Sequence, residues 1–528
     1  MLPRMDFVLA CLMTCIICLA APVVSSGVSP AAPAKAGDTA VNVPDPNLRT
    51  ELRRLTGIPA DQVLYRSDLA GLTGTINLSN KNIVNAEGLQ YCRSIESLYL
   101  DHNYLSSLPD GLAEMTHLQV LHMQDNEFAD IPTQLFTLEN LTILDMSENP
   151  ISSIHTGIAG LSSLRALILE NCRLIQFPAA VLALQLRVLD LSGNTFATVP
   201  SGISGMKKMV ILSLRQTGLT EMPGGLSALP YLEQLDLSQN NITELPGENL
   251  RFEQLQRLDL SGNALSRLPD AIGRLPRLKE LILDQNPLTR LPDAIGRSSL
   301  TVLSVYGCRL NKLPNSLGQS ESLSHLELAC NQLTYLPANL ATRTFEFVNL
   351  DFNFIDLTPG SSASIILERL NCGTLYDKRQ LKPVRGLSAD AGLDSIALSW
   401  QAGENGQDGA AAWEVDRYQL YQNRDGVLDL LVESGTTAYT HKKLTPGTSY
   451  TYCARIVYHI TDSVSGLDRT VSCDTTISVS TRPSAGPGTT AKEKPAPAFS
   501  VPGWPIVLTG LAGLGLIIVM IVWIKRRF

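Results

Sequence analysis

The sequence has few of the residues and motifs on which most catalytic sites depend. Only 7 of its 528 residues are histidine, and aromatic residues make up 6%. No phosphate-binding glycine loop, GxSxG elbow or HExxH metal motif occurs. His117 and His122 are five residues apart, which does not suit a metal site on one helix. The sequence therefore predicts a protein that is not an enzyme and that uses no metal or cofactor.

An excess of positive charge is also lacking. Lysine and arginine total 42 against 50 aspartates and glutamates, which leaves a net charge of −8. Proteins that bind nucleic acid usually carry a basic patch or a strongly basic domain. We therefore expect no nucleic-acid partner.

Leucine, in contrast, recurs at a fixed spacing through more than half of the chain. Residues 95–115 read IESLYLDHNYLSSLPDGLAEM and residues 118–138 read LQVLHMQDNEFADIPTQLFTL, and both follow LxxLxLxxNxLxxLPxxLxxL. A strict period of 22 or 23 residues is typical of a solenoid, in which each unit packs on its neighbours. Full copies begin at Ile95, Leu118, Leu141, Leu164, Leu186, Met209, Leu232, Leu255, Leu278, Leu300 and Leu323, with a worn copy from Thr73 and a truncated one from Phe345.

The pattern resembles that of the leucine-rich repeat family. The resemblance implies an α/β solenoid of about 12–13 repeats over residues 73–357, with parallel strands on its concave face. The asparagine after each strand, such as Asn103, is expected to satisfy buried backbone groups rather than to act in catalysis. Cys172 and Cys308 take this position in two repeats, and we expect both to be buried free thiols. The LP pair of each repeat begins the convex side, where short helical turns are expected.

The segment before the repeats, residues 45–72, reads as a helical cap. Asp45 or Asn47 can cap a helix with Pro46 near its start, and leucines follow at helical spacing. A solenoid needs such a segment because its end would otherwise expose core leucines. The stretches DPNL, LTG and DLAGLTGTINLSNKNI resemble the N-terminal cap of internalin-like surface proteins, which implies a bacterial origin. We expect residues 358–380 to close the other end.

Residues 381–482 replace the repeat with alternating apolar residues, which is typical of a β-sandwich. SIALSW, YQLYQN and LTPGTSYTYCARIV resemble a fibronectin type III domain, with Tyr450 as its corner tyrosine. Cys453 and Cys473 lie on the last two expected strands and could form a disulfide. Their positions on the strands place them on opposite faces of a flat ladder, so a bridge would require a bulge.

The two ends of the chain predict export and anchoring. Residues 1–26 combine a basic residue, an apolar run and small residues, as a secretory signal peptide does. Residues 27–44 read as a spacer and residues 483–503 as a proline-rich stalk. Residues 504–524 predict a single transmembrane helix, and the basic tail 525–528 places the C-terminus inside. The expected location is the cell membrane with the N-terminus outside. The alternative is a C-terminal sorting tag that is cleaved, leaving the protein at the cell surface.

The concave face is the predicted binding surface. Its side chains are the non-leucine strand positions, where acidic residues outnumber the single base, Arg215. An acidic face of this kind would suit a basic or polar partner, either a protein or a glycan. The candidate ligand-binding residues are Tyr99, Asp101, His122, Asp145, Glu170, Asp190, Asp236, Asp259, Asp284, Tyr306 and Glu327.

Three functions are compatible with this organisation. The first is an exported, membrane-anchored recognition or adhesion protein that binds its partner on the concave face. The second is a structural or envelope-assembly spacer without a discrete ligand. The third, which we favour least, is an enzyme with catalysis at His102 and His122 on the same face.

Overall fold

A computed structural model of the chain describes residues 38–482 except 248, 378, 409–410, 425–426 and 463–466. The signal peptide (1–26), the stalk (483–503), the transmembrane helix (504–524) and the basic tail (525–528) lie outside the described residues, as does most of the spacer. Among the helices that the structure describes, none has both the length and the apolar character needed to cross a bilayer.

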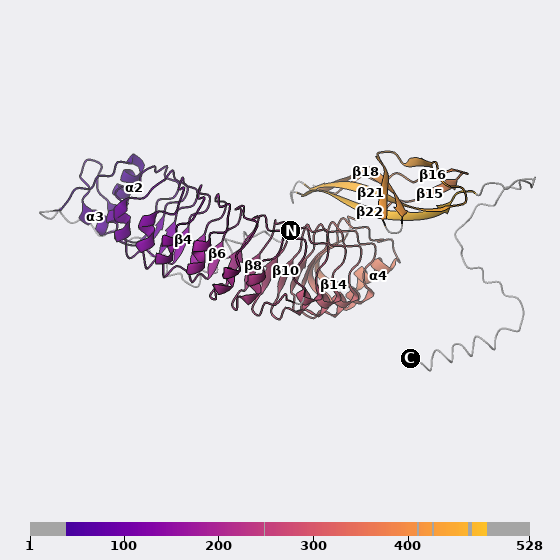
Figure 1. The fold of residues 1–528 in the computed structure, drawn as a ribbon, viewed down its shortest axis with the longest axis horizontal. Coiled ribbons are helices and arrows are strands. Elements are labelled where there is room, and N and C mark those ends of the chain that lie inside the picture. The colour runs from indigo at the N-terminus through magenta and orange to yellow at the C-terminus, as the bar shows by residue number, and fades with distance from the viewer. Residues whose placement is uncertain are drawn as a thin grey trace, which may run out of the picture.

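The repeats form one continuous sheet of 14 strands in chain order, and neighbouring strands pair in parallel throughout (Figure 1). Most strands are only three residues long, because each repeat turns away from the sheet directly after LxL. The strands are β1 (Thr73–Asn77), β2 (Ser94–Tyr99), β3 (Val120–His122), β4 (Ile143–Asp145), β5 (Ala166–Ile168), β6 (Val188–Asp190), β7 (Ile211–Ser213), β8 (Gln234–Asp236), β9 (Arg257–Asp259), β10 (Glu280–Ile282), β11 (Val302–Ser304), β12 (His325–Glu327), β13 (Thr344–Asn349) and β14 (Asn371–Tyr376).

The opposite side of the solenoid consists of short 3₁₀ turns, most of which follow the LP pair directly. Proline suits this position because its fixed φ angle and missing N–H cost little at the start of a turn. Each turn buries one apolar side chain, for example Leu112 or Ile158. The turns are η1 (Leu89–Tyr91), η2 (Asp110–Glu114), η3 (Thr133–Thr137), η4 (Thr156–Gly160), η5 (Ala179–Ala183), η6 (Ser201–Gly205), η7 (Gly224–Ala228), η8 (Asp270–Arg274), η9 (Asp293–Arg297), η10 (Asn315–Gln319) and η11 (Ala338–Thr342).

Buried asparagines connect successive repeats. Asn149 donates from Nδ2 to the carbonyls of Met123 (2.9 Å) and Met146 (3.0 Å), and its Oδ1 accepts from the backbone N–H of Phe128 (3.0 Å). One side chain thus satisfies backbone groups of two neighbouring repeats, which lowers the cost of burying them. Cys172 and Cys308 occupy the same position and are buried outside any disulfide, as expected, with their thiols directed to the carbonyls of Met146 (3.6 Å) and Leu283 (3.3 Å).

The N-terminal cap contains α2 (Pro46–Thr56) and α3 (Arg66–Ala70). Asp45 is the N-cap of α2, because its Oδ1 accepts from the backbone N–H groups of Asn47 (2.9 Å) and Leu48 (3.0 Å). Its other oxygen accepts from the N–H of Val84 (2.8 Å), so one carboxylate fixes both the helix and its position on the first repeat. The apolar side chains of the helix, including Leu48 and Leu52, continue the solenoid core.

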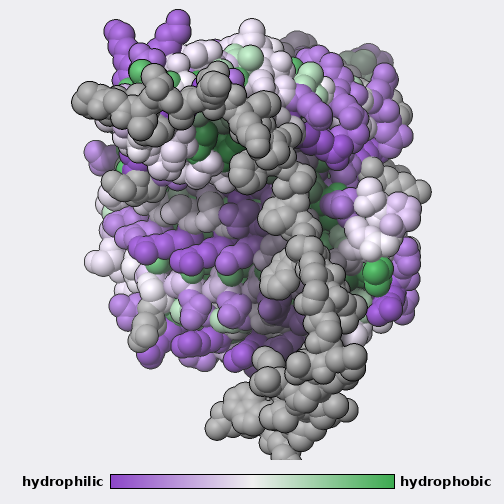
Figure 2. All heavy atoms as spheres, turned by 90° about the vertical axis from the view of Figure 1, so that its right-hand side faces the viewer, coloured by the Kyte–Doolittle hydropathy of each residue, from purple (hydrophilic) through white to green (hydrophobic). Residues whose placement is uncertain are grey.

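The C-terminal closing segment extends the solenoid instead of only covering it. Helix α4 (Ser362–Arg369) takes the place of a 3₁₀ turn, and β14 then pairs in parallel with β13. The strand array therefore continues beyond residue 357, where the sequence pattern ends. Residues 358–376 do not keep the leucine spacing of the repeats, so the sequence pattern does not reveal this last turn. Ile366 and Leu367 nevertheless enter the core. At this end of the molecule, hydrophilic side chains make up much of the visible surface (Figure 2).

Residues 388–480 form a β unit of two antiparallel sheets. The hydroxyl of Tyr450 accepts from the N–H of Thr445 (2.9 Å), which closes the corner before its strand. The first sheet contains β15 (Ser388–Ala391), β16 (Ser395–Ser399) and β20 (Ala438–Lys442). The second contains β17 (Gly406–Asp408), β18 (Ala411–Arg424), β19 (Val427–Ser434), β21 (Ser449–Asp462) and β22 (Leu467–Ser480).

The possible disulfide between Cys453 and Cys473 is not formed, and both thiols are free. In the ladder of β21 and β22, Cys473 lies opposite Ile456 and Cys453 lies opposite Thr476. The register therefore separates the two cysteines by three positions and turns them to opposite faces of the sheet. The pairing hypothesis was wrong because no bulge corrects this register between them.

The β unit lies beside the last repeats rather than beyond the end of the solenoid (Figure 1). Phe352 contacts Trp413 edge-on with 5.9 Å between ring centroids, and Phe354 contacts Tyr458 at 6.4 Å. Phe352 and Phe354 are 3% and 4% exposed. The two parts of the molecule thus share one apolar cluster, which we call the junction, and it also includes Cys330.

Candidate ligand-binding face

Strand register brings seven of the eleven predicted binding residues into one row, and the other four follow the strands two residues later. Tyr99 lies opposite His122, His122 opposite Asp145, and Asp236 opposite Asp259 on adjacent strands. Parallel strands in register place such residues about 4.8 Å apart on one face of a sheet. The complete row is Asn77, Tyr99, His122, Asp145, Ile168, Asp190, Ser213, Asp236, Asp259, Ile282, Ser304, Glu327, Asn349 and Tyr376.

The recurring Asp-x-Ser stretches of this row form a local hydrogen-bonded turn. Asp190 Oδ1 accepts from the backbone N–H of Ser192 (2.9 Å) and from its hydroxyl (2.6 Å). This contact orients the carboxylate at the point where the strand ends and leaves Oδ2 outside the turn. The same contact recurs at Asp145 (3.0 and 2.8 Å), at Asp259 (3.0 and 2.7 Å) and, through the backbone alone, at Asp236 (2.8 Å).

Aromatic and acidic side chains meet at the N-terminal end of the row. The rings of Tyr99 and His122 are stacked with centroids 4.8 Å apart and planes inclined by 14°. His122 Nδ1 lies 3.6 Å from Asp145 Oδ2, the carboxylate oxygen that takes no part in the Asp-x-Ser turn. Asp101 accepts from the hydroxyl of Ser79 (3.1 Å), so it is tied to the preceding repeat. The three repeats therefore present a fixed aromatic surface beside carboxylates.

At the C-terminal end, the predicted face adjoins the junction. Tyr306 is partly buried and packs against the junction cluster, so only part of its ring is available to a ligand. Asp284 accepts from the hydroxyl of Ser304 (2.6 Å) and from the N–H of Tyr306 (2.8 Å). Glu327 accepts from the side-chain amide of Asn349 (3.0 Å). These acids are therefore held by neighbouring strands.

Burial changes the protonation of several carboxylates in the row. It raises the pKa of Asp190 to about 7, with the bonds from Ser192 acting in the opposite direction. It also raises the pKa of Asp236 to about 6, and repulsion from Asp259 adds to the increase. Glu327 has its pKa raised to about 7 by burial. The negative charge of these three groups consequently grows as the pH rises through their pKa values.

Sequence reasoning missed a second row on the same face. The residue two positions before each member of the first row also points away from the leucine core, because side chains alternate along a strand. In the central repeats this row is apolar, and Ile143, Ala166, Val188 and Ile211 pack against one another. Further along, Arg257 and Glu280 form an ion pair across adjacent strands. The signal that could have revealed this row is the third position of LxxLxL, which directly precedes the second leucine.

The remaining predicted residue, Glu170, follows β5, and its N–H donates to the hydroxyl of Ser147 (3.2 Å).

Within the part of the chain that the structure describes, no three histidine, cysteine, aspartate or glutamate side chains are grouped to hold a metal ion. His102 and His122 do not share a partner, because His102 Nδ1 lies 2.8 Å from Asp125 whereas His122 faces Asp145.

Comparison with known proteins supports the solenoid. Models described as leucine-rich repeat match residues 116–174, 230–288 and 185–206, and no curated protein matches the chain. An internalin (InlF) of Listeria monocytogenes is similar in structure, with a TM-score of 0.53 and 22% identity over 62% of this chain and 94% of that chain. This likeness shows the fold, and the segments that the models match are leucine-rich repeats.

Two further solved structures match less closely. A leucine-rich repeat protein of Leptospira interrogans has a TM-score of 0.42 and 25% identity, covering 56% of this chain and 94% of that chain. The PEPR1–AtPEP1 structure has a TM-score of 0.43 and 23% identity, covering 54% of this chain and 44% of that chain.

Proposed function

We propose that the protein is a recognition protein whose concave face binds a protein partner that presents basic or polar side chains. The observation that carries this proposal is the in-register row with carboxylates on β4, β6, β8, β9 and β12. A solenoid offers such a row as a rigid, preformed surface, so little ordering is needed on binding. Acidic residues of the row would select against acidic partners and speed association with basic ones.

Two parts of the row support contacts of different kinds. The stacked pair of Tyr99 and His122 offers a flat surface of the sort enriched in protein interfaces. Asp259 lies near Arg257 (3.9 Å), so a basic side chain of a partner would compete for its Oδ2. A glycan partner would use the same aromatic surface, with the carboxylates as acceptors for hydroxyl groups.

We also propose that the β unit is a fibronectin type III domain. Three features support this: sheets of three and five strands, the Tyr450 corner, and Trp400, whose ring lies 5.8 Å from that of Tyr418. Together with the predicted signal peptide, stalk and transmembrane helix (504–524), it would hold the recognition face outside a cell membrane. Mass spectrometry of the mature C-terminus tests the anchor, because a retained helix and a cleaved sorting tag predict different masses.

A displayed peptide library selected on the full chain tests the recognition function. We expect the selected peptides to be rich in lysine and arginine. Above pH 7, where Asp190 and Asp236 are ionised, the triple variant D190N/D236N/D259N should bind them roughly tenfold or more weakly, because asparagine keeps the bond to the following serine but loses the charge. The matched control, D110N/D130N/D270N, removes three exposed charges away from the strands and should bind like the wild type. Peptides without basic residues, or equal loss in both variants, would contradict the proposal.

The alternative is a spacer without a discrete ligand, and one observation favours it. The junction buries aromatic side chains from both parts of the molecule, which suits a stiff support. A spacer predicts that no peptide is enriched above background on the wild type. It also predicts that substitutions at the junction, rather than on the concave face, impair its role.

A further inference from the structure

A second charged surface lies on the edge of the solenoid, away from the concave row. Its residues occupy the position before the Leu-Pro pair of each repeat, or before the Met-Pro pair that replaces it at residues 222–223. This position is Glu221 and Glu244 in two central repeats, then Arg267, Arg290 and Lys312 in the next three. Residues 251–312 contain ten lysines and arginines against six aspartates and glutamates, although acids exceed bases in the whole chain (50 against 42). The positive charge is therefore concentrated in one short part of an acidic protein.

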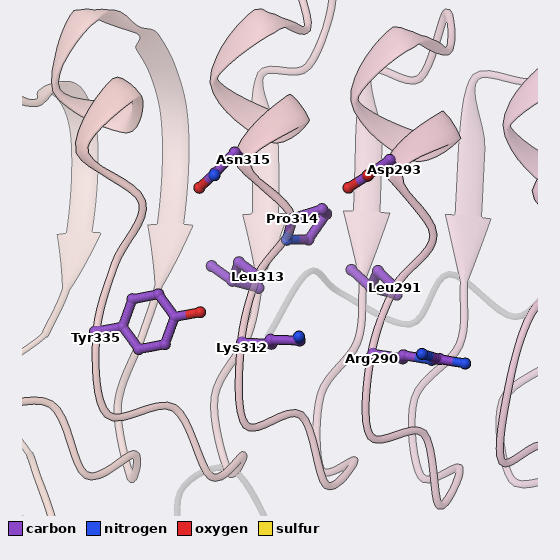
Figure 3. A pocket seen from close by; sticks show the side chains of 8 residues that line it. All are labelled: Arg290, Leu291, Asp293, Lys312, Leu313, Pro314, Asn315 and Tyr335. Atoms are coloured by element: carbon purple, nitrogen blue, oxygen red, sulfur yellow. The ribbon is translucent and has the colours of Figure 1, made fainter.

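The same position continues as Tyr335 in the following repeat, so an aromatic ring adjoins the two last cations. Figure 3 shows Arg290, Lys312 and Tyr335 on three successive turns of the solenoid. They line a surface hollow of about 370 Å³ together with Asp293 and Asn315. The hollow lies between repeats, because Arg290, Lys312 and Tyr335 come from three successive repeats.

These side chains are available to a ligand. Tyr335 is 47% exposed, and Arg290 and Lys312 are exposed as well. Arg267 lies 3.6 Å from Glu244, whereas neither Arg290 nor Lys312 has a carboxylate within 4.0 Å among the described residues. Two neighbouring cations without a counter-ion repel one another, and an anion placed between them would relieve that repulsion.

We propose that this hollow binds an acidic polysaccharide. Its acidic groups would pair with Arg290 and Lys312, and a sugar ring would pack on the exposed face of Tyr335. Asn315 and Asp293 supply the acceptors and donors that sugar hydroxyls require. Asp293 also disfavours more densely charged polyanions such as nucleic acid, because its carboxylate lies in the same hollow. The site is separate from the concave face, so it adds a second ligand to the proposed recognition function.

Binding of chondroitin sulfate oligosaccharides to the full chain tests the site, with polyglutamate as a polyanion without sugar rings. We expect R290A/K312A to bind chondroitin sulfate roughly tenfold or more weakly than the wild type, because two charge-assisted contacts are lost. The matched control is K207A/K208A, which removes two exposed lysines from another part of the solenoid and should retain the wild-type affinity.

Substitutions of Tyr335 distinguish a site that recognises a sugar ring from a site that binds any polyanion. Y335A should weaken the binding of chondroitin sulfate and leave that of polyglutamate unchanged, and Y335F should retain both, since the ring remains. Wild-type affinity in R290A/K312A, equal loss in K207A/K208A, or no effect of Y335A would overturn the proposal. The concave variant D190N/D236N/D259N should bind chondroitin sulfate normally, so a failure here is distinguishable from a failure of the concave-face hypothesis.

Discussion

The solenoid and the β unit are stabilised by contacts of different range. In the solenoid, each three-residue strand pairs only with the strands of the repeats before and after it. In the β unit, β16 pairs with β20 through Ser395 and Lys442, across several intervening strands. Stability in a solenoid is a sum of nearest-neighbour terms, whereas a sandwich requires distant segments to assemble together. The comparison teaches that periodic sequence suffices for the first kind of structure but not for the second.

The junction makes the two kinds of stability interdependent. Phe352 and Phe354 belong to the last repeats, yet they are buried by Trp413 and Tyr458 of the β unit. Arg379 adds an ion pair with Asp408 at 2.9 Å on the connecting segment. We therefore expect the β unit and the last repeats to unfold as one cooperative unit.

The largest effect is expected from breaking this connection. Phe352→Ala should reduce the stability of the junction by about 3–5 kcal/mol, the usual cost of removing a buried phenylalanine ring. Thermal unfolding should then separate into two transitions, with fluorescence of Trp400 and Trp413 following the β unit and circular dichroism following both parts. Phe177→Ala, within the solenoid, is the control and should lower stability without separating the transitions. A single transition in both variants would show that the junction does not couple the two parts.

A somewhat smaller effect is expected within the asparagine ladder. Asn149→Ala should cost about 3 kcal/mol, because it leaves the N–H of Phe128 and the carbonyls of Met123 and Met146 without their partner. Asn149→Thr should cost less, since Thr217 fills the equivalent position and donates to the carbonyl of Leu214 (2.9 Å). Urea unfolding measures both. Equal losses would mean that a hydroxyl does not replace the hydrogen bonds of the amide at this position.

A third substitution tests how closely the repeats pack on the convex side. A Cβ atom at Gly296 would lie 2.1 Å from the backbone carbonyl of Ser316 in the next repeat. Gly296→Ala should therefore destabilise the solenoid by about 1–3 kcal/mol through overpacking. At Gly205 an added Cβ meets nothing within 4 Å, so Gly205→Ala serves as the control. The melting temperatures of the two variants should differ, and identical values would indicate that neighbouring repeats can move apart.

The smallest effect concerns a surface ion pair of the solenoid. The hydrogen bond from His102 to Asp125 (2.8 Å) raises the pKa of the histidine. Because the folded-state pKa is raised, the stabilisation is complete below the unfolded pKa of about 6.5 and is lost as the pH rises through the folded value. Solvent screens this half-exposed pair, so the contribution should stay below about 1 kcal/mol. Proton NMR should show a lower pKa for His102 in D125N, and an unchanged value would disprove the assignment.

The candidate site could be predicted in part. Leucine spacing alone placed residues such as Asp190 and Asp236 in one row, because the register of parallel repeats follows from their equal length. The hydrogen bonds of Asp190 to Ser192 were not predicted, since they depend on the backbone turn after the strand. The apolar row through Ile143 and Val188 was overlooked, although the alternation of side chains implied it.

The sequence by itself determined the solenoid: its core leucines, its asparagine ladder and its acidic row. Each follows from local periodicity, because every repeat meets its neighbour in the same way. Only the tertiary structure decided that β14 extends the sheet, that Tyr306 packs against the junction and that Phe352 meets Trp413. Those contacts join segments that are distant in the chain and share no period. Their geometry depends on how the whole β unit packs against the last repeats.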